Sequence, residues 1–323
     1  MNSFRMDVRI EAGVVPDDLA HFAAARDANF FQSPHWLRLV AKVDPSYRPW
    51  VPCVYNAQGQ LLAALPLFAV QRWGKRRLYA GPWGTYGGIV SRDQRATTLL
   101  GDWFDDAVRR SLLTRVHDFA ASLGSLAPPW RGTAESCQVL QLPEDPAELF
   151  QGAFASQNRN KIRKAEKNDV RVELHQDATA MQRYAELYAQ SAQRLQVAVP
   201  TPPALFHGLA DCPGVEVWLA ERQGTTIAGL LNFSWGGQIM NWGNVSIPES
   251  WQHAPNNLLH WKAIEHACLA EQAPRLYNFG SSSGLPQVHA FKKSFGAVDR
   301  TYWRWERSAI WLRALQRLRG GQS

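Results

Sequence analysis

The chain has few lysines, no closely spaced cysteines and no long uninterrupted apolar segment. Its longest apolar run, residues 61–70, is interrupted by Pro66 and is far shorter than the roughly 20 residues that a transmembrane helix needs. Residues 1–9 are polar and lack the pattern of a secretory signal peptide. The sequence therefore predicts neither an integral membrane protein nor an exported one, and we expect a cytoplasmic protein.

The four cysteines are too far apart for a zinc site or a CxxC redox motif. We therefore expect reduced thiols and no bound metal. The sequence also contains no P-loop, no H-E-x-x-H motif, and no G-x-G-x-x-G that opens a helix after a strand. These absences argue against nucleotide hydrolysis and zinc proteolysis.

The 35 basic residues outnumber the 28 acidic ones, which gives a net charge of +7 and a pI near 9.4. A basic protein favours anionic partners, here phosphates, a nucleotide donor, tRNA or the inner membrane surface. Only eight of the basic residues are lysines, and five of these fall in two clusters, 161–167 and 292–293. The two clusters are therefore the first candidates for anion binding.

Capping residues and apolar periodicity predict a helix that begins after Ser33, and further helices at residues 97–123, 155–168, 177–195 and 256–271. Residues 50–70 are typical of a β-hairpin with its turn at Asn56–Gln60.

An internal duplication follows from this hairpin. Residues 56–68 align without gaps on residues 221–233, with identical Gln, Gly, Ala, Leu and Phe residues. The order of strands and helices predicts layered α/β (α+β) units, each with a mixed, mostly antiparallel sheet flanked by helices. Prolines near residue 145 indicate a boundary, so we expect an N-terminal domain at 1–150 and a C-terminal domain at 151–323.

Residues 280–284 match the G-x-S-x-G pattern of a serine-hydrolase nucleophile. In that fold an acid and then a histidine follow the serine, but no histidine follows Asp299 or Glu306, the only acids after Ser282. A turn rich in backbone N–H groups is the better interpretation of this loop.

Five stretches resemble, in chain order, the signatures of Fem-type transferases of the GNAT superfamily. They are Phe31-Gln32-Ser33-x-x-Trp36, residues 81–88, Arg159-x-x-x-Arg163-Lys164-Ala165-Glu166-Lys167, Tyr277–Gly280 and Phe291–Gly296. The resemblance implies tandem GNAT-like domains and acyl transfer from an activated donor to an amine. The implied co-substrate is acyl-CoA or aminoacyl-tRNA, with no tightly bound cofactor. The implied acceptor is an envelope precursor or a small metabolite.

The resemblance also implies site residues. Lys292 would polarise the reacting carbonyl or bind a phosphate, Lys293 would assist it, and His289 is a candidate base. Arg159, Arg163 and Lys164 would hold an anionic part of donor or acceptor. Further donor- or substrate-binding positions are Tyr86, Asn256, Asn257, Asn278, Gly280, Ser281 and Phe291.

The chain departs from the family pattern in two places. The GNAT signature Q/R-x-x-G-x-G/A is absent at residues 255–259, where a helix nonetheless begins after a strand and can offer N–H groups to a pyrophosphate. The coiled-coil arm of some Fem-type proteins is also absent. Three functions stay open: an acyl-CoA-dependent N-acyltransferase, an aminoacyl-tRNA-dependent peptidoglycan ligase, and a non-catalytic module that binds an anionic envelope precursor.

Overall fold

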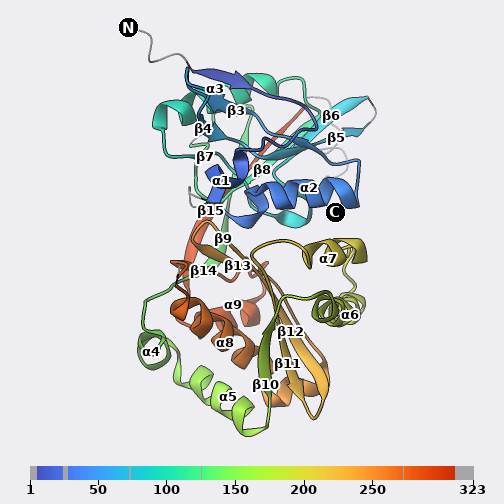
Figure 1. Ribbon diagram of the computed structural model, residues 1–323, viewed down its shortest axis with the longest axis vertical. Coiled ribbons are helices and arrows are strands. Elements are labelled where there is room, and N and C mark those ends of the chain that lie inside the picture. Colours follow the sequence, from blue (N-terminus) through green and yellow to red (C-terminus); the bar gives the residue numbers. More distant parts are fainter. Residues whose placement is uncertain (1–5, 25–27, 73, 125, 272, 310–323) are drawn as a thin grey trace, which may run out of the picture. The chain divides into compact units, whose positions relative to one another are not determined.

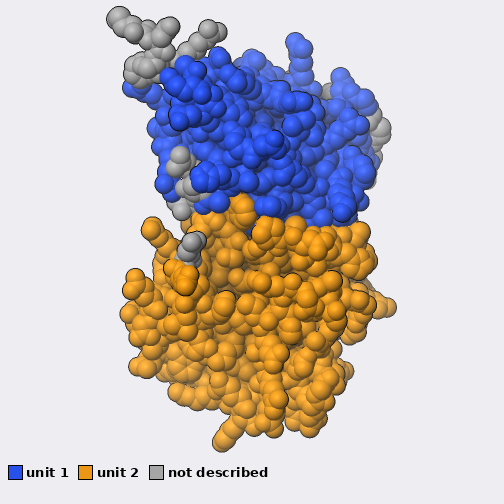
Figure 2. Space-filling view, viewed as in Figure 1, with its two compact units in different colours: residues 1–135, 301–323 blue, residues 136–300 orange. Residues whose placement is uncertain are grey.

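The computed structural model describes residues 6–24, 28–72, 74–124, 126–271 and 273–309. The chain forms two compact units, residues 1–135 with 301–323 (unit 1) and residues 136–300 (unit 2), which Figure 2 shows in blue and orange. The predicted division after residue 150 differs from these units because the chain enters unit 2 within one strand, near residue 136, and returns to unit 1 within another, near residue 300. The division into functional domains stays a prediction.

Unit 1 contains one sheet in the order β2-β5-β6-β8-β15 and a smaller sheet in the order β1-β3-β4-β7. Its helices and strands are β1 (Asp7–Arg9), α1 (Leu19–Ala24), the 3-10 turn η1 (Phe30–Gln32), α2 (Pro34–Val43), β2 (Arg48–Trp50), β3 (Cys53–Tyr55), β4 (Leu61–Ala64), β5 (Leu67–Arg72), β6 (Lys75–Tyr79), η2 (Pro82–Gly84), β7 (Val90–Ser91), α3 (Gln94–Ala107), β8 (Leu113–Asp118) and β15 (Val298–Ser308).

Unit 2 contains one sheet in the order β10-β11-β12-β13-β14-β9. Its elements are β9 (Arg131–Gln141), α4 (Pro146–Glu148), the π-helical turn η3 (Leu149–Ala153), α5 (Ser156–Lys167), β10 (Arg171–His175), α6 (Ala178–Arg194), α7 (Pro203–Leu209), β11 (Val215–Arg222), β12 (Thr225–Trp235), β13 (Gln238–Ser246), η4 (Pro248–His253), α8 (Pro255–Leu269), β14 (Leu276–Asn278) and α9 (Pro286–Lys293). In Figure 1, α6 and α7 lie on one side of this sheet and α5 and α8 on the other.

The two units repeat one pattern of strand pairing. In unit 1, β6 is antiparallel to β5 and parallel to β8, and β8 is antiparallel to β15, with α3 between the two parallel strands. In unit 2, β13 is antiparallel to β12 and parallel to β14, and β14 is antiparallel to β9, with α8 between the parallel strands. The predicted fold of two related α/β halves with mixed, mostly antiparallel sheets is confirmed.

Local sequence signals placed most elements correctly. Ser33 caps α2 through its hydroxyl, which accepts from Trp36 N–H at 3.3 Å. The helices predicted at 155–168, 177–195 and 256–271 are α5, α6 and α8. The helix predicted at 97–123 is wrong in its second half, because α3 ends at Ala107 and residues 113–118 form β8. In β8 buried and less buried side chains nearly alternate, as on a strand that packs one face on a core.

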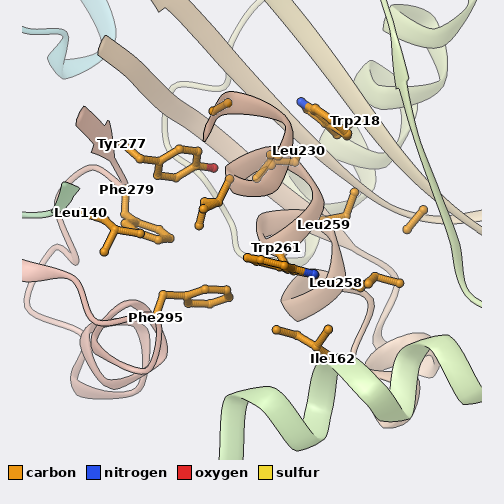
Figure 3. Close-up of a cluster of buried hydrophobic side chains, with 14 of the residues drawn as sticks. Leu140, Ile162, Trp218, Leu230, Leu258, Leu259, Trp261, Tyr277, Phe279 and Phe295 are labelled. Carbon is orange, nitrogen blue, oxygen red and sulfur yellow. The ribbon is translucent and has the colours of Figure 1, made fainter. Parts of the chain in front are cut away.

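The core of unit 2 lies between the sheet and the helices α5 and α8. Figure 3 shows Trp261 and Leu258 of α8 beside Ile162 of α5, with Phe295 and Phe279 completing the cluster. All are nearly inaccessible to water. The helix α8 shows no polar face because it packs against both α5 and the sheet.

Candidate active site

The two parallel strands at the centre of unit 2 separate. Their pairing covers Gln238–Met240 of β13 and Leu276–Asn278 of β14. Beyond it, β13 continues to Ser246, whereas the chain leaves β14 at Gly280 with a positive φ of 73°. The separated part of β13 presents backbone N–H and C=O groups on the edge that faces away from β12. Ligands of open α/β sheets bind at the carboxyl ends of such strands.

A β-bulge lies at the same point of β13. The register with β12 pairs Asn232 with Asn241 and Leu231 with Gly243, so it passes over Trp242. Trp242 packs on Phe233 at 5.3 Å between ring centroids. A bulge re-aims side chains and is frequent beside active sites.

A chain of hydrogen bonds joins the exposed Asn244 to three buried side chains of unit 2. Asn244 Nδ2 lies 3.1 Å from His260 Nε2, His260 Nδ1 lies 3.0 Å from the Tyr277 hydroxyl, and that hydroxyl lies 3.4 Å from Asn232 Oδ1. Burial, assisted by the positive charge of Lys292, lowers the pKa of His260 to about 3, so its ring is neutral. With Asn244 donating to Nε2, the proton is on Nδ1 and is donated to Tyr277, which donates to Asn232. The chain connects β12, β13, α8 and β14 in one direction.

Lys292 is the buried cation of the site. Its side chain comes from the last turn of α9, is 7% exposed, and its Nζ donates to Gly280 O and Ser281 O, each at 2.8 Å. Burial lowers the pKa of Lys292 from 10.5 to about 8. Two of the three ammonium protons are directed to the loop after β14. The preceding Phe291 packs on the His260 ring at 5.5 Å between centroids.

Asn278, the last residue of β14, is fully buried and incompletely hydrogen-bonded. Its Oδ1 accepts from Gly280 N–H at 2.8 Å, whereas its Nδ2 has no hydrogen-bond partner among the described residues. A buried unpaired donor costs about 1–3 kcal/mol unless a ligand or water satisfies it. Lys292 thus binds the carbonyl groups of Gly280 and Ser281, and Asn278 binds the Gly280 N–H; that these residues form the edge of a pocket stays a prediction.

His289 and Lys293 lie on α9 and contact Asp299. His289 Nε2 is 2.9 Å and Lys293 Nζ 3.6 Å from the carboxylate, and all three side chains are partly exposed. Hydrogen bonds from Gln138 and His289 lower the pKa of Asp299. The Ser282 hydroxyl donates to Gln138 Oε1 at 2.5 Å rather than to a histidine, so the G-x-S-x-G match is not a serine-hydrolase dyad.

Asn256 and Asn257 lie in the first turn of α8. The side chain of Asn257 is buried and donates to Asn158 Oδ1 at 2.8 Å, which fixes α8 to α5. Asn256 donates to Ser246 Oγ at 3.2 Å, and its Oδ1 is without a partner in the described part of the chain. No side chain caps α8. Asn256 is therefore the better placed of the two for contact with a ligand.

The basic residues of α5 have different environments. Arg159 donates from Nη1 to the carbonyl oxygens of Phe154, Gln151 and Phe150, which end the π-helical turn before α5. Arg163 lies over the Phe150 ring at 5.6 Å and is exposed, as is Lys164. Arg159 thus has a local role, whereas the exposed cations of this helix are Lys161, Arg163, Lys164 and Lys167.

Tyr86 belongs to unit 1, where it is buried and its ring lies 5.0 Å from those of Phe119 and Tyr302. Among the described residues there is no cluster of three metal-ligating side chains. Within those same ranges, no helix is long and apolar enough to cross a bilayer.

Sequence reasoning missed the four-residue network of Asn232, Asn244, His260 and Tyr277. These side chains come from four elements, and no short motif links them. The one local signal was His260, a polar residue among the apolar positions of a predicted buried helix.

Comparisons with known proteins agree with this geometry. Residues 153–292 match the model of the acetyltransferase (GNAT) domain family. The chain is similar to the crystal structure of FemX, with 14% identity and a TM-score of 0.74 over 95% of this chain and 99% of that one. It is also similar to the C-terminal domain of a putative lysylphosphatidylglycerol synthetase from Agrobacterium fabrum, with 9% identity and a TM-score of 0.60 over 90% and 92% of the two chains.

A third similar structure is a tandem GNAT protein from the clavulanic acid biosynthesis pathway, with 15% identity and a TM-score of 0.50 over 94% and 98% of the two chains. No curated protein matches the sequence. Residues 153–292 therefore form a GNAT-type transferase domain, in a chain that shares the fold of FemX along nearly its whole length.

Proposed function

We propose that the protein is an N-acyltransferase that moves an acyl group from a coenzyme A thioester to an amine on an envelope precursor or a small metabolite. The observation that carries the proposal is that two buried donors contact the same residue, Gly280, where β13 and β14 separate. The Lys292 ammonium donates to Gly280 O, and Asn278 accepts from Gly280 N–H while its Nδ2 has no partner among the described residues. Donors of this kind stabilise negative charge that develops on a carbonyl oxygen.

The proposed reaction is attack of the amine nitrogen on the thioester carbon. A C–N bond forms, the carbonyl oxygen becomes an oxyanion, and the C–S bond then breaks with departure of the thiol. The remaining N–H of Lys292 and the Asn278 amide would stabilise the oxyanion. One proton must pass from the amine to the sulfur, and His289 is the proposed base because its ring is held by Asp299 at 2.9 Å.

The donor phosphates would bind at the first turn of α8, beside Asn256. Helix N-termini attract phosphate through unsatisfied N–H groups and the helix dipole. The helix α5 packs against α8, and the exposed Arg163 and Lys164 add positive charge on α5. We assign Asn256, Arg163 and Lys164 to binding of the donor phosphates. Lys293, which follows Lys292 in α9, is assigned to the same anionic part of the donor.

The tandem GNAT protein is described in a form without acetyl-CoA, and we take this reference to a thioester as support for a thioester donor. A second candidate donor is aminoacyl-tRNA, supported by the similarity to FemX and by the exposed cations of α5. The lysylphosphatidylglycerol synthetase among the similar structures supports an envelope acceptor. The described cysteines are all free thiols, which supports a reducing compartment such as the cytoplasm.

The first test is thermal unfolding of the full chain with acetyl-CoA, longer acyl-CoAs, free CoA and uncharged tRNA. A ligand at 100 times its Kd stabilises the native state by about 2.7 kcal/mol, which raises Tm by several degrees. We expect stabilisation by CoA species. Stabilisation by tRNA alone would replace the thioester proposal with the ligase, and no shift with any donor would contradict both.

The second test is release of free CoA in the presence of a panel of amines. Lys292→Met should lower turnover by about a hundredfold, as for loss of one oxyanion donor. Lys262→Met is the matched control, because Lys262 lies on α8 and pairs with Glu265 at 2.8 Å. Equal turnover in the two variants would remove Lys292 from the mechanism. Donor binding without turnover for every amine would favour a binding module.

A further inference from the structure

Asn244 lies on the part of β13 that has separated from β14. The pairing of the two strands ends at Met240, and Asn244 is four residues farther along β13, about 13 Å at about 3.3 Å per residue. Asn244 is exposed, whereas its hydrogen-bond partner His260 is only 1% exposed. The Asn244 amide thus has one end on the buried network and the other end toward solvent.

Neighbouring groups fix the direction of the hydrogen bonds in this network. Asn241 Nδ2 donates to Asn232 Oδ1 at 3.1 Å, so Asn232 presents its oxygen here and also receives the single proton of the Tyr277 hydroxyl. The Tyr277 oxygen then accepts from His260 Nδ1, which leaves Nε2 of the neutral His260 ring as an acceptor. Asn244 therefore donates from Nδ2 to His260, and its Oδ1 is turned away from the ring.

The network orients a side chain and does not conduct protons. Its two ends, Asn232 and Asn244, are amides, which neither take up nor release a proton near neutral pH. Burial also keeps His260 neutral by lowering its pKa to about 3. Polar side chains that pair with one another in a core specify a single arrangement, which apolar side chains at the same positions do not. The network therefore gives the exposed Asn244 amide one fixed orientation.

Asn244 lies between the two ends of the proposed donor site. Two residues beyond it, Ser246 Oγ accepts from Asn256 Nδ2 at 3.2 Å, at the turn assigned to the donor phosphates. In the other direction along β13, Met240 is paired with Asn278, which is assigned to the reacting carbonyl. A donor held at both ends passes Asn244. In CoA the chain between the phosphates and the sulfur carries amide N–H groups, for which a carbonyl oxygen is the matching acceptor.

We propose that Asn244 Oδ1 accepts a hydrogen bond from an amide N–H of CoA, and that His260 and Tyr277 are positioning residues that hold the Asn244 amide for this contact. The proposal rests on the proposed thioester donor. The phosphates set where the donor binds, and Asn244 sets how far the thiol end extends toward Lys292. An Asn244 side chain that rotated freely would offer Nδ2 in place of Oδ1, and Nδ2 cannot accept from an amide N–H.

The contact is tested by calorimetric titration of the full chain with CoA and with the nucleotide half of CoA, which keeps the phosphates and lacks the amide chain. Asn244→Ala should weaken CoA binding about fivefold, as for loss of one neutral hydrogen bond, and leave binding of the nucleotide half unchanged. Gln190→Ala is the matched control, because Gln190 is an exposed amide on α6, on the other side of the sheet from α8 (Figure 1). Equal CoA affinity of Asn244→Ala and wild type, or equal weakening of both ligands, would overturn the proposal.

The positioning role is tested at His260. His260→Leu removes the acceptor for Asn244 Nδ2 and should weaken CoA binding as Asn244→Ala does, whereas His260→Gln can accept through Oε1 and should recover part of the affinity. Unchanged binding of the nucleotide half shows that each variant is folded; if His260→Leu binds neither ligand, Asn244→Ala at its exposed position decides. Wild-type CoA affinity in His260→Leu would refute the positioning role. No binding of CoA by the wild-type chain would overturn the thioester donor and the Asn244 contact together.

Discussion

Removal of the Lys292 charge should change how stability depends on pH. The native state releases its Lys292 proton near the lowered pKa of about 8, and the unfolded chain near 10.5. Between these pH values the unfolded chain binds more protons, so wild-type stability rises with pH relative to Lys292→Met. At about 1.36 kcal/mol per pH unit, the shift from 10.5 to about 8 corresponds to at most about 3.4 kcal/mol. Water that reaches Lys292 beside the exposed Ser281 reduces this figure.

Urea unfolding of both proteins at pH 7, 8, 9 and 10, followed by circular dichroism, measures this difference. From pH 7 to pH 10, we expect the free energy of unfolding of wild type to increase by about 2–3 kcal/mol relative to that of Lys292→Met. All other titrating groups are common to both chains, so their contributions cancel in this difference. Lys262→Met provides the reference for loss of a lysine from α8. A difference between wild type and Lys292→Met that is constant with pH would show that burial does not lower the pKa of Lys292.

Three further substitutions test the packing of unit 2, each by urea unfolding. Gly243→Ala should lower the free energy of unfolding by about 1–3 kcal/mol, because a Cβ there would overlap the Tyr184 hydroxyl. Adding Tyr184→Phe to this variant should restore part of the loss. If it restores none, the overlap with the hydroxyl is not the cause of the destabilisation. Tyr277→Phe should cost about 1–3 kcal/mol, because it leaves His260 Nδ1 without its buried partner, and a neutral effect would mean that water replaces the hydroxyl. Arg159→Ala should cost about 1–2 kcal/mol through the carbonyls at the end of η3, whereas wild-type stability would mean that Arg159 is free to bind anions.

The sequence predicted the elements whose signals are local. The start of α2 follows from a serine cap and a proline, and the hairpin of β11 and β12 follows from Gln223 and Gly224, which both adopt a positive φ. The helix predicted through residue 123 failed because the segment after Ala107 carries apolar residues at spacings that fit both a helix and a buried strand. The segment becomes a strand by pairing with β6 and with β15, the latter some 190 residues away in the chain.

Some residues of the candidate site could likewise be predicted from local motifs, and others could not. Lys292, Asn278 and Gly280 could be predicted because two short motifs carry them, and the structure joins these motifs through the Lys292 ammonium. The network of His260 and Tyr277 could not, because its members are far apart in the chain and each alone looks like a core residue.

The repeated architecture gives a structural reason to place the candidate site in unit 2, although both units have the same parallel strand pair. In unit 1 the pairing of β6 with β8 ends at Tyr79 and Arg115, and the chain then turns back so that Gly87 forms a bridge with Asp118 and its N–H donates to His117 O at 2.8 Å. The residues after β6 thus occupy the edge of β8 themselves. In unit 2, β13 runs on past the end of its pairing with β14, and a bulge lies at Trp242, whose ring packs on Phe233. In unit 1 the chain's own backbone occupies this position, whereas unit 2 keeps a strand edge, a buried ammonium and an amide without a partner among the described residues. The proposed acyl transfer rests on this difference.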